Sequence, residues 1–331
     1  KKLLKFSLFL FSIIFLAIIY LSTFGINTEK FNERVRNEIL SINKKISLEL
    51  KSVKFLLNPL NLSISVMTND PTVAINNKKI ELAFIKTNIS LKSFINKKIS
   101  IDDLKISTKK IKLNNVILLF RSFKDSTEMF VLNNIIKDGF IVSDINLNFD
   151  DKGNIKDDYE IKGYLKEGKI DVLKKYLIND LNFIFNIKNK DYNLKEIECD
   201  FNQIKLFSPL VNIKEKKNQF LIDGNLISKK NNFNADSLKN LFGNEIKNYG
   251  IEYVNFDSEN NFNFAVNKKF KIKKFNLESI ISLNKLVYKN DLSNIVKYLP
   301  SFKNSIKLED HKIYINYKKN KLNIEGKGKI V

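Results

Sequence analysis

Apolar and polar residues alternate with a period of two along most of this chain. Successive side chains of a β-strand point to opposite faces of a sheet, so the alternation predicts strands with one apolar and one polar face. Polar turn sequences separate the runs, which is typical of antiparallel sheets. The clearest runs lie at 60–66, 145–149, 181–187, 262–266 and 313–317.

Segments with helical spacing of apolar residues are few and short. We expect a helix over 28–45 and shorter ones at about 122–138, 171–178, 235–244 and 291–299. These segments cannot cover the apolar faces of so many strands. The sequence therefore predicts that this surface is buried by the sheet itself, as a barrel or sandwich, or by something that is not protein. The pattern leaves both options open.

The first 27 residues have the composition of a membrane-spanning helix. Three lysines, Lys1, Lys2 and Lys5, precede an uncharged stretch over 6–28. About 20 apolar residues suffice to cross a bilayer, whereas a cleaved signal peptide has an apolar region of about 7–15 residues and a small-x-small cleavage site. The sequence after Tyr20 offers no good cleavage site, so we predict an uncleaved anchor with its amino terminus in the cytoplasm. The predicted anchor residues are Phe6, Leu10, Ile14, Ile18 and Tyr20.

The formal net charge of +21 invites a nucleic-acid interpretation, which the distribution of the charge weakens. Phosphate and base recognition draws on arginine, and the basic residues here are lysines apart from Arg34, Arg36 and Arg121. The lysines are scattered along the chain and indicate a solvated face. We expect no nucleic-acid partner, with attraction to anionic lipid headgroups as the weaker alternative.

Candidate catalytic chemistry is sparse. Adjacent carboxylates at 102–103, 150–151 and 157–158 suggest turns, because neighbours on a strand point to opposite faces. His311 is the only histidine, and Cys199 lies between two acidic residues that should raise the pKa of its thiol. The sequence contains no glycine-rich phosphate loop, nucleophile elbow or HExxH pair. We predict no enzymatic activity, no cofactor and no metal.

The amino-terminal third resembles the same region of AsmA-like proteins. The likeness is carried by the anchor and the helix after it, by Asn58-Pro59-Leu60-Asn61-Leu62-Ser63-Ile64, and by the segments 69–73 and 80–111. It extends over residues 1–120. Later hairpins, such as 159–170, are similar to the repeating β units of this family, which includes TamB-like members and is similar to chorein-type bridge proteins.

This resemblance implies a fold and a function. The expected fold is mainly β: a transmembrane helix, then an elongated, curved antiparallel sheet shaped as a groove, with a few short helices. The expected location is the inner membrane, with most of the chain in the periplasm. The groove would carry phospholipid acyl chains between the two membranes of a Gram-negative envelope, with an outer-membrane protein as a possible partner.

The resulting hypothesis divides the chain into an anchor (1–27), a helix and first β region (28–121) and a β-groove region (122–331) that we expect to continue in a longer protein. The alternatives are an envelope assembly factor with a closed β core, and a lysine-rich surface that binds a polyanion. The candidate groove residues are Ile145, Leu147, Phe149, Leu181, Phe183, Phe185, Phe262 and Phe264.

Overall fold

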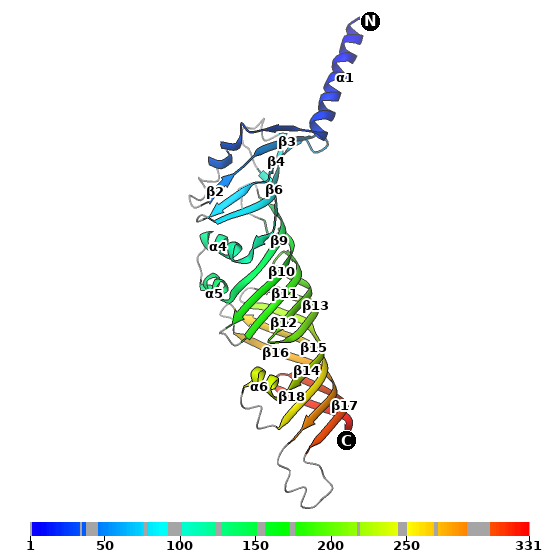
Figure 1. Cartoon of the computed structure of the whole chain (residues 1–331). Coiled ribbons are helices and arrows are strands. Elements are labelled where there is room, and N and C mark those ends of the chain that lie inside the picture. Colours follow the sequence, from blue (N-terminus) through cyan, green and yellow to red (C-terminus); the bar gives the residue numbers. More distant parts are fainter. Residues whose placement is uncertain are drawn as a thin grey trace, which may run out of the picture. The chain divides into compact units, whose positions relative to one another are not determined.

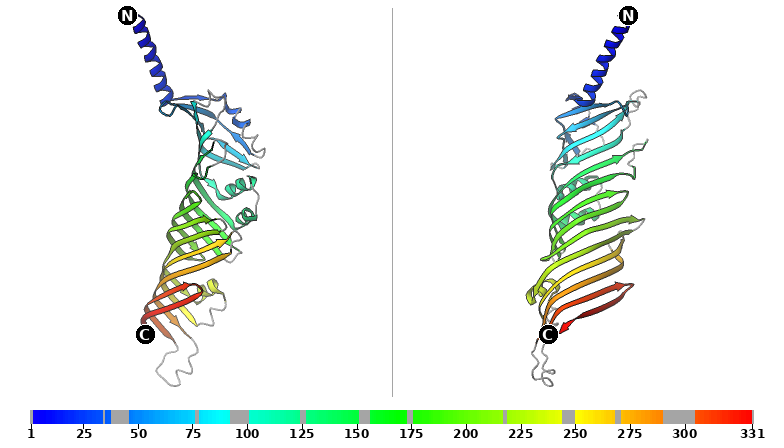
Figure 2. Two further views of the ribbon diagram at one scale, coloured as in Figure 1. Left: turned by 180° about the vertical axis from the view of Figure 1, so that it is seen from behind. Right: turned by 90° about the vertical axis from the view of Figure 1, so that its right-hand side faces the viewer.

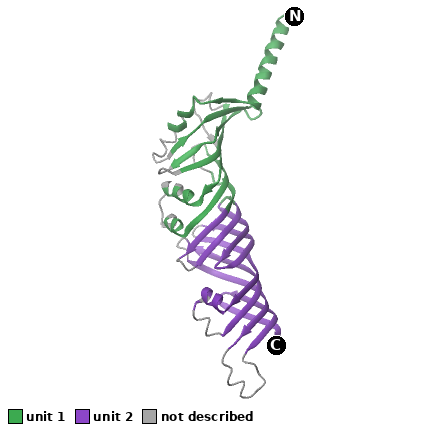
Figure 3. Ribbon diagram, in the orientation of Figure 1, with its two compact units in different colours: residues 1–165, 186–189 green, residues 166–185, 190–331 purple. Residues whose placement is uncertain are grey.

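The chain forms one 18-stranded antiparallel sheet that is curved and unclosed (Figure 1). The structure is a computed structural model. The chain divides into two compact units: unit 1 is Lys1–Leu165 with Asn186–Asn189, and unit 2 is Lys166–Phe185 with Lys190–Val331 (Figure 3). The predicted antiparallel, mainly β fold is confirmed. The described residues are 2–33, 35–37, 46–75, 78–91, 101–123, 127–150, 156–172, 176–216, 219–243, 250–267, 271–289 and 305–330.

Unit 1 begins with the long apolar helix α1 (Lys2–Thr23) and continues as a sheet, with the helices α4 and α5 among its described elements. In order across the sheet, β1 pairs with β3, β3 with β4, β4 with β6, β6 with β7, and β7 with β9. Strand β5 pairs with both β6 and β2, and β8 pairs with β9. The strands are β1 (Ile26–Thr28), β2 (Ile46–Glu49), β3 (Ser52–Asn58), β4 (Ser63–Asn69), β5 (Thr72–Ile75), β6 (Lys78–Ser90), β7 (Ile101–Thr108), β8 (Ile111–Lys112) and β9 (Ile136–Asn148). The helices are α4 (Leu113–Phe123) and α5 (Thr127–Ile135).

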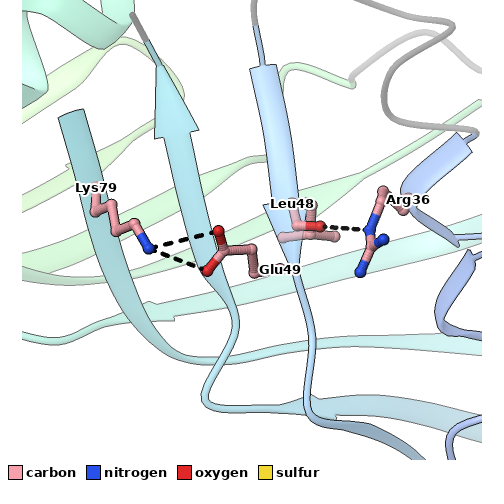
Figure 4. A network of polar contacts seen from close by, with 4 residues as sticks. All are labelled: Arg36, Leu48, Glu49 and Lys79. Atoms are coloured by element: carbon pink, nitrogen blue, oxygen red, sulfur yellow. Dashed lines mark hydrogen bonds and ion pairs between the residues drawn. The ribbon is translucent and has the colours of Figure 1, made fainter. Parts of the chain in front are cut away.

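The core of unit 1 lies between its sheet and α4. Ile80, Leu82 and Ile111 are buried, and Val116 of α4 packs against them. One contact network fixes the short strand β2 on both of its sides (Figure 4). Arg36 Nε donates to the carbonyl oxygen of Leu48 (3.3 Å), and Lys79 Nζ lies 3.3 Å from a carboxylate oxygen of Glu49.

Unit 2 is a meander in which consecutive strands are hydrogen-bonded neighbours (Figure 2). Three of its hairpins turn through two residues with positive φ, the geometry that matches the right-handed twist of strands: Asn189–Lys190, Asn202–Gln203 and Lys319–Asn320. Its elements, the first of which starts in unit 1, are β10 (Glu160–Val172), β11 (Tyr176–Lys188), β12 (Asp191–Phe201), β13 (Ile204–Lys216), β14 (Gln219–Asn234), α6 (Ala235–Phe242), β15 (Ile251–Asn267), β16 (Ile272–Tyr288), β17 (Ile306–Lys318) and β18 (Lys321–Ile330).

Charged residues with positive φ interrupt the ladders of unit 2. Lys230, Lys274 and Asp310 each lie where the pairing register slips, which marks a β-bulge. A bulge increases the local twist and bends the strand. Because the bulges recur on several neighbouring strands, they account for curvature of this sheet.

Helix α6 covers one end of the apolar face of unit 2. Asn234 caps it, since its side-chain oxygen accepts from the backbone N–H of Ser237 (2.9 Å), and Gly243 ends it with a positive φ. Its buried Leu238 completes a cluster with three residues of the sheet, Phe233, Val254 and Leu283.

Several helix predictions need correction. Segment 235–244 is confirmed as α6, but 171–172 and 176–178 belong to β10 and β11, because pairing with neighbouring strands overrides a weak helical pattern. The helix predicted at 122–138 is two helices, of which α4 starts earlier, and β9 begins at Ile136. Thr28 lies in a strand, and only 32–33 and 35–37 of the predicted first helix are described as helical. Residues 38–45 and 291–299 lie outside the described part of the chain.

Candidate apolar groove

Aromatic side chains from neighbouring strands gather on one face of unit 2. Phe262 of β15 lies directly opposite Gly224 of β14 and Leu277 of β16, so all three share a face. Phe264 lies two residues further along the same face, with its ring 5.9 Å from that of Phe262. The row continues to Phe275, whose ring centroid is 6.1 Å from that of Phe264.

These residues line an open groove, which we call the Phe groove. Its volume is about 520 Å³. Phe275 remains 37% exposed. Its lining residues are Val211, Ile222, Leu226, Asn260, Phe262, Phe264, Phe275 and Leu277.

A bulge on β16 presents Phe275 to the groove. The register slips so that two residues, Lys274 and Phe275, oppose Phe264 alone. Lys274 has a positive φ of 53°, as the first residue of a G1-type bulge does. The bulge therefore adds one aromatic ring to the groove from a lysine-rich stretch of sequence.

A band of buried polar side chains separates the Phe groove from the cluster under α6. Asn260 Nδ2 donates to the carbonyl oxygen of Leu226 (3.0 Å), and its Oδ1 accepts from Ser279 Oγ (2.5 Å). Ser228 Oγ donates to Asn231 Oδ1 at 2.9 Å. Because the groups of this band satisfy one another, they remain stable when buried. The open apolar surface of unit 2 thus ends at this band of polar residues.

The opposite face of the same strands is wet. Asparagines and acidic residues pair across it: Asn212 with Asp223 (2.9 Å), and Asn276 with Asn263 (2.8 Å). The predicted alternation is therefore confirmed in these strands, with an apolar face and a polar face back to back.

The predicted groove residues fall into three places. Phe262 and Phe264 line the Phe groove. Ile145 and Leu147 lie on the apolar face of unit 1, directly opposite Ile106 and Leu104 of β7, with the half-buried Phe149 just after them. Leu181 and Phe183 of β11 are half-buried, whereas Phe185 is 6% exposed, with its ring 6.2 Å from that of Phe183.

The sequence analysis missed six residues of the groove: Val211, Ile222, Leu226, Asn260, Phe275 and Leu277. Strand β14 contains the unbroken apolar run Phe220-Leu221-Ile222, which hides its alternation. Two of these residues could have been found by their spacing from Gly224. Ile222 and Leu226 lie two residues to either side of this glycine and so share its face of the sheet.

Helix α1 is long and apolar enough to cross a membrane, and it has no buried residues. The predicted anchor residues Phe6, Leu10, Ile14 and Tyr20 are exposed along it, and Ile18 is half-exposed. Such a helix is consistent with a single-pass anchor.

The polar residues considered for catalysis do not form a constellation. Burial, and then the carboxylate of Asp200, raises the pKa of the Cys199 thiol, which disfavours the reactive thiolate. The Nδ1 atom of His311 is 2.9 Å from the carbonyl oxygen of Glu309, two residues away. Asp157 and Asp158 lie in a turn, as predicted, whereas the turn predicted at Asp102 and Asp103 is wrong, because both lie in β7. Among the described residues, no three His, Cys, Asp or Glu side chains are grouped as metal ligands would be.

No protein-family model, curated protein or solved structure matches this chain. The resemblance to AsmA-like proteins therefore stays a prediction.

Proposed function

We propose that this protein is a membrane-anchored carrier or shield for the acyl chains of phospholipids. The observation that supports the proposal is the Phe groove, an aromatic surface on an unclosed sheet in which Phe275 remains 37% exposed. Contiguous apolar surface that is open to solvent is a feature of ligand-binding grooves. The volume of the groove, about 520 Å³, is within the range of roughly 300–1,000 Å³ that is typical of small-molecule sites.

An acyl chain suits this surface better than a polar ligand does. Each CH₂ group that leaves water contributes about 0.8 kcal/mol, and the binding needs no directional partner. The polar band at Asn260 closes one side of the groove. A headgroup can remain in water because the groove is open.

The cellular role follows from the anchor and the family resemblance together. Helix α1 supports a single-pass membrane anchor, and the resemblance to AsmA-like proteins implies the inner membrane, with most of the chain in the periplasm. In this location the groove would contribute to lipid transport from the inner to the outer membrane and so to outer-membrane integrity. An outer-membrane protein is the proposed partner at the far membrane.

Photo-crosslinking in intact cells tests the proposal. A photoreactive phenylalanine analogue replaces Phe264 in the groove, and in a matched variant it replaces Asn263, the adjacent residue on the polar face. We expect phospholipid adducts, identified by mass spectrometry, at position 264 and not at 263. Equal adducts at both positions, or none at either, would contradict the proposal and favour the assembly-factor alternative.

A further inference from the structure

Two leucines stand exposed in a tight turn of unit 1. Residues 59–62 connect β3 to β4, and within them Leu60 is 94% exposed and Leu62 is 55% exposed. The alternation predicted a strand here, which is wrong, because β4 begins at Ser63. Turns favour Gly, Asn, Asp, Pro and Ser. The core of unit 1 therefore does not explain these leucines.

Hydrogen bonds hold this turn in place. The Asn61 N–H donates to Asn58 Oδ1 (3.2 Å), and the Leu62 N–H donates to the Pro59 carbonyl oxygen (3.4 Å). The Leu62 carbonyl oxygen in turn accepts from the backbone N–H of Leu91 (2.8 Å). Leu62 adopts a positive φ of 45°, which is unfavourable for a leucine by about 1–2 kcal/mol. A fixed turn thus presents apolar side chains where asparagine or glycine would fit more easily.

The turn lies beside the end of the apolar helix. Strand β1 pairs antiparallel with β3, with Ile26 opposite Phe55, so the end of β3 runs back alongside the last residues of α1. Gly25, which follows α1 with a positive φ of 69°, packs against the backbone of Phe55. No flexible linker separates helix and sheet, because both flanking elements are hydrogen-bonded at this point (Figure 1).

The same corner carries further exposed apolar and aromatic side chains. Phe24 is 63% exposed and its ring is 5.5 Å from that of Tyr20. Ile26 is also exposed. Aromatic and apolar residues at the end of a spanning helix lie at the level of the lipid headgroups. The turn therefore continues a surface that already meets the membrane.

We propose that the 59–62 turn inserts Leu60 and Leu62 into the interface of the membrane that α1 spans. This inference rests on the anchor of the proposed function, and is independent of lipid carriage in the Phe groove. The helix and the turn together attach unit 1 at two points. Two points restrict the tilt of unit 1 against the membrane, whereas a single helix could tilt in the bilayer together with the sheet that follows it.

Depth-dependent fluorescence quenching tests the inference on the full chain in lipid nanodiscs. Cys199→Ser removes the native thiol, and single cysteines replace Leu60, Ile14 or Lys110, each carrying an environment-sensitive dye. Position 14 reports the anchor. Lys110 is the control, because it is exposed on the bend after β7, which is four pairings away from β1, or about 19 Å at 4.8 Å per strand.

We expect nitroxide lipids labelled near the headgroup to quench position 60 several-fold more than position 110. Nitroxides near the chain ends should quench position 14 most. Quenching at 14 with equal, weak quenching at 60 and 110 would overturn the turn insertion and leave the anchor intact. Weak quenching at 14 would overturn both. Protection of position 60 from a water-soluble quencher without lipid quenching would show a protein partner instead, and would also overturn the inference.

Discussion

The ring of Phe262 lies over Gly224, its direct cross-strand partner. A Cβ atom at position 224 would be 2.9 Å from the Phe262 Cζ atom and 2.9 Å from the Val211 Cγ2 atom. A glycine with ordinary strand geometry is thus required by its neighbours and not by its backbone. It allows the ring of Phe262 to approach the backbone of β14 closely and to line the Phe groove.

Gly224→Ala should therefore destabilise the strands of the groove. Overpacking of this kind typically costs about 1–3 kcal/mol, because the ring and the valine must move. The matched control is Gly326→Ala in β18, where an added Cβ meets nothing within 4 Å. Hydrogen exchange of the β14–β16 amides measures the effect. Faster exchange in both variants, or in neither, would contradict the packing explanation.

A charge in the Phe groove should reduce bound lipid. Phe264→Asp places a carboxylate where an acyl chain would desolvate it, and a loss of 1.4 kcal/mol already lowers affinity about tenfold. Asn263→Asp adds the same charge to the polar face and keeps an oxygen acceptor for Asn276. Lipid per protein, measured by mass spectrometry after purification, should fall at least several-fold for the first variant alone.

Equal lipid content in the two variants would show that the groove is not the site of binding. A loss in both would point to a general effect of charge on the chain. Neither result is compatible with acyl chains lying against Phe264.

Much of the fold could be predicted because alternation is a local property of the sequence. Phe262 and Phe264 stand two residues apart on one strand, and that spacing alone places them on one face. The same logic correctly placed Ile145 with Leu147. Helix α6 was also predictable, because Asn234 and Gly243 are ordinary cap residues.

The bulges and the turns could not be predicted in the same way. Lys230 and Lys274 adopt positive φ although lysine does not prefer it, because pairing with the neighbouring strand fixes their conformation. Leu60 and Leu62 continue the strand period into a turn, so periodicity assigned them to the wrong element. In each case the deciding interactions come from residues distant in sequence.

The polar band should behave as one cooperative unit. Asn260→Ala removes the bonds to Leu226 and Ser279 and leaves the buried Ser279 hydroxyl without its partner, at a cost of about 1–3 kcal/mol. Ser279→Ala should cost less, and the double variant should cost less than the sum of the two. The midpoint of urea unfolding, measured on the detergent-solubilised chain, gives the loss of stability for each variant. Additive effects would mean that the two side chains act independently.

Replacing Leu238, the buried leucine of α6, should detach that helix from the sheet. Leu238 is 5% exposed, and Leu→Ala substitutions in cores typically cost about 2–5 kcal/mol. Asn240→Ala, at an exposed position of the same helix, is the control and should be neutral or slightly stabilising. Hydrogen exchange should increase in α6 and at Val254 and Leu283 for L238A only. Unchanged exchange would show that the cluster does not depend on the helix.

The thiol of Cys199 should alkylate slowly, because burial and the nearby Asp200 raise its pKa above the usual value. A raised pKa leaves less thiolate at any pH below it, and the thiolate is the nucleophile. The reaction with a neutral maleimide at pH 8 should therefore be slower than with free cysteine. Asp200→Asn removes the negative charge, the smaller of the two causes, and should therefore accelerate the reaction. The amide oxygen of the new side chain can still accept from the Gln203 N–H. Asp191→Asn, at the other end of β12, removes the same charge and should leave the rate unchanged. Equal rates for the two variants would mean that burial alone sets the reactivity of this thiol.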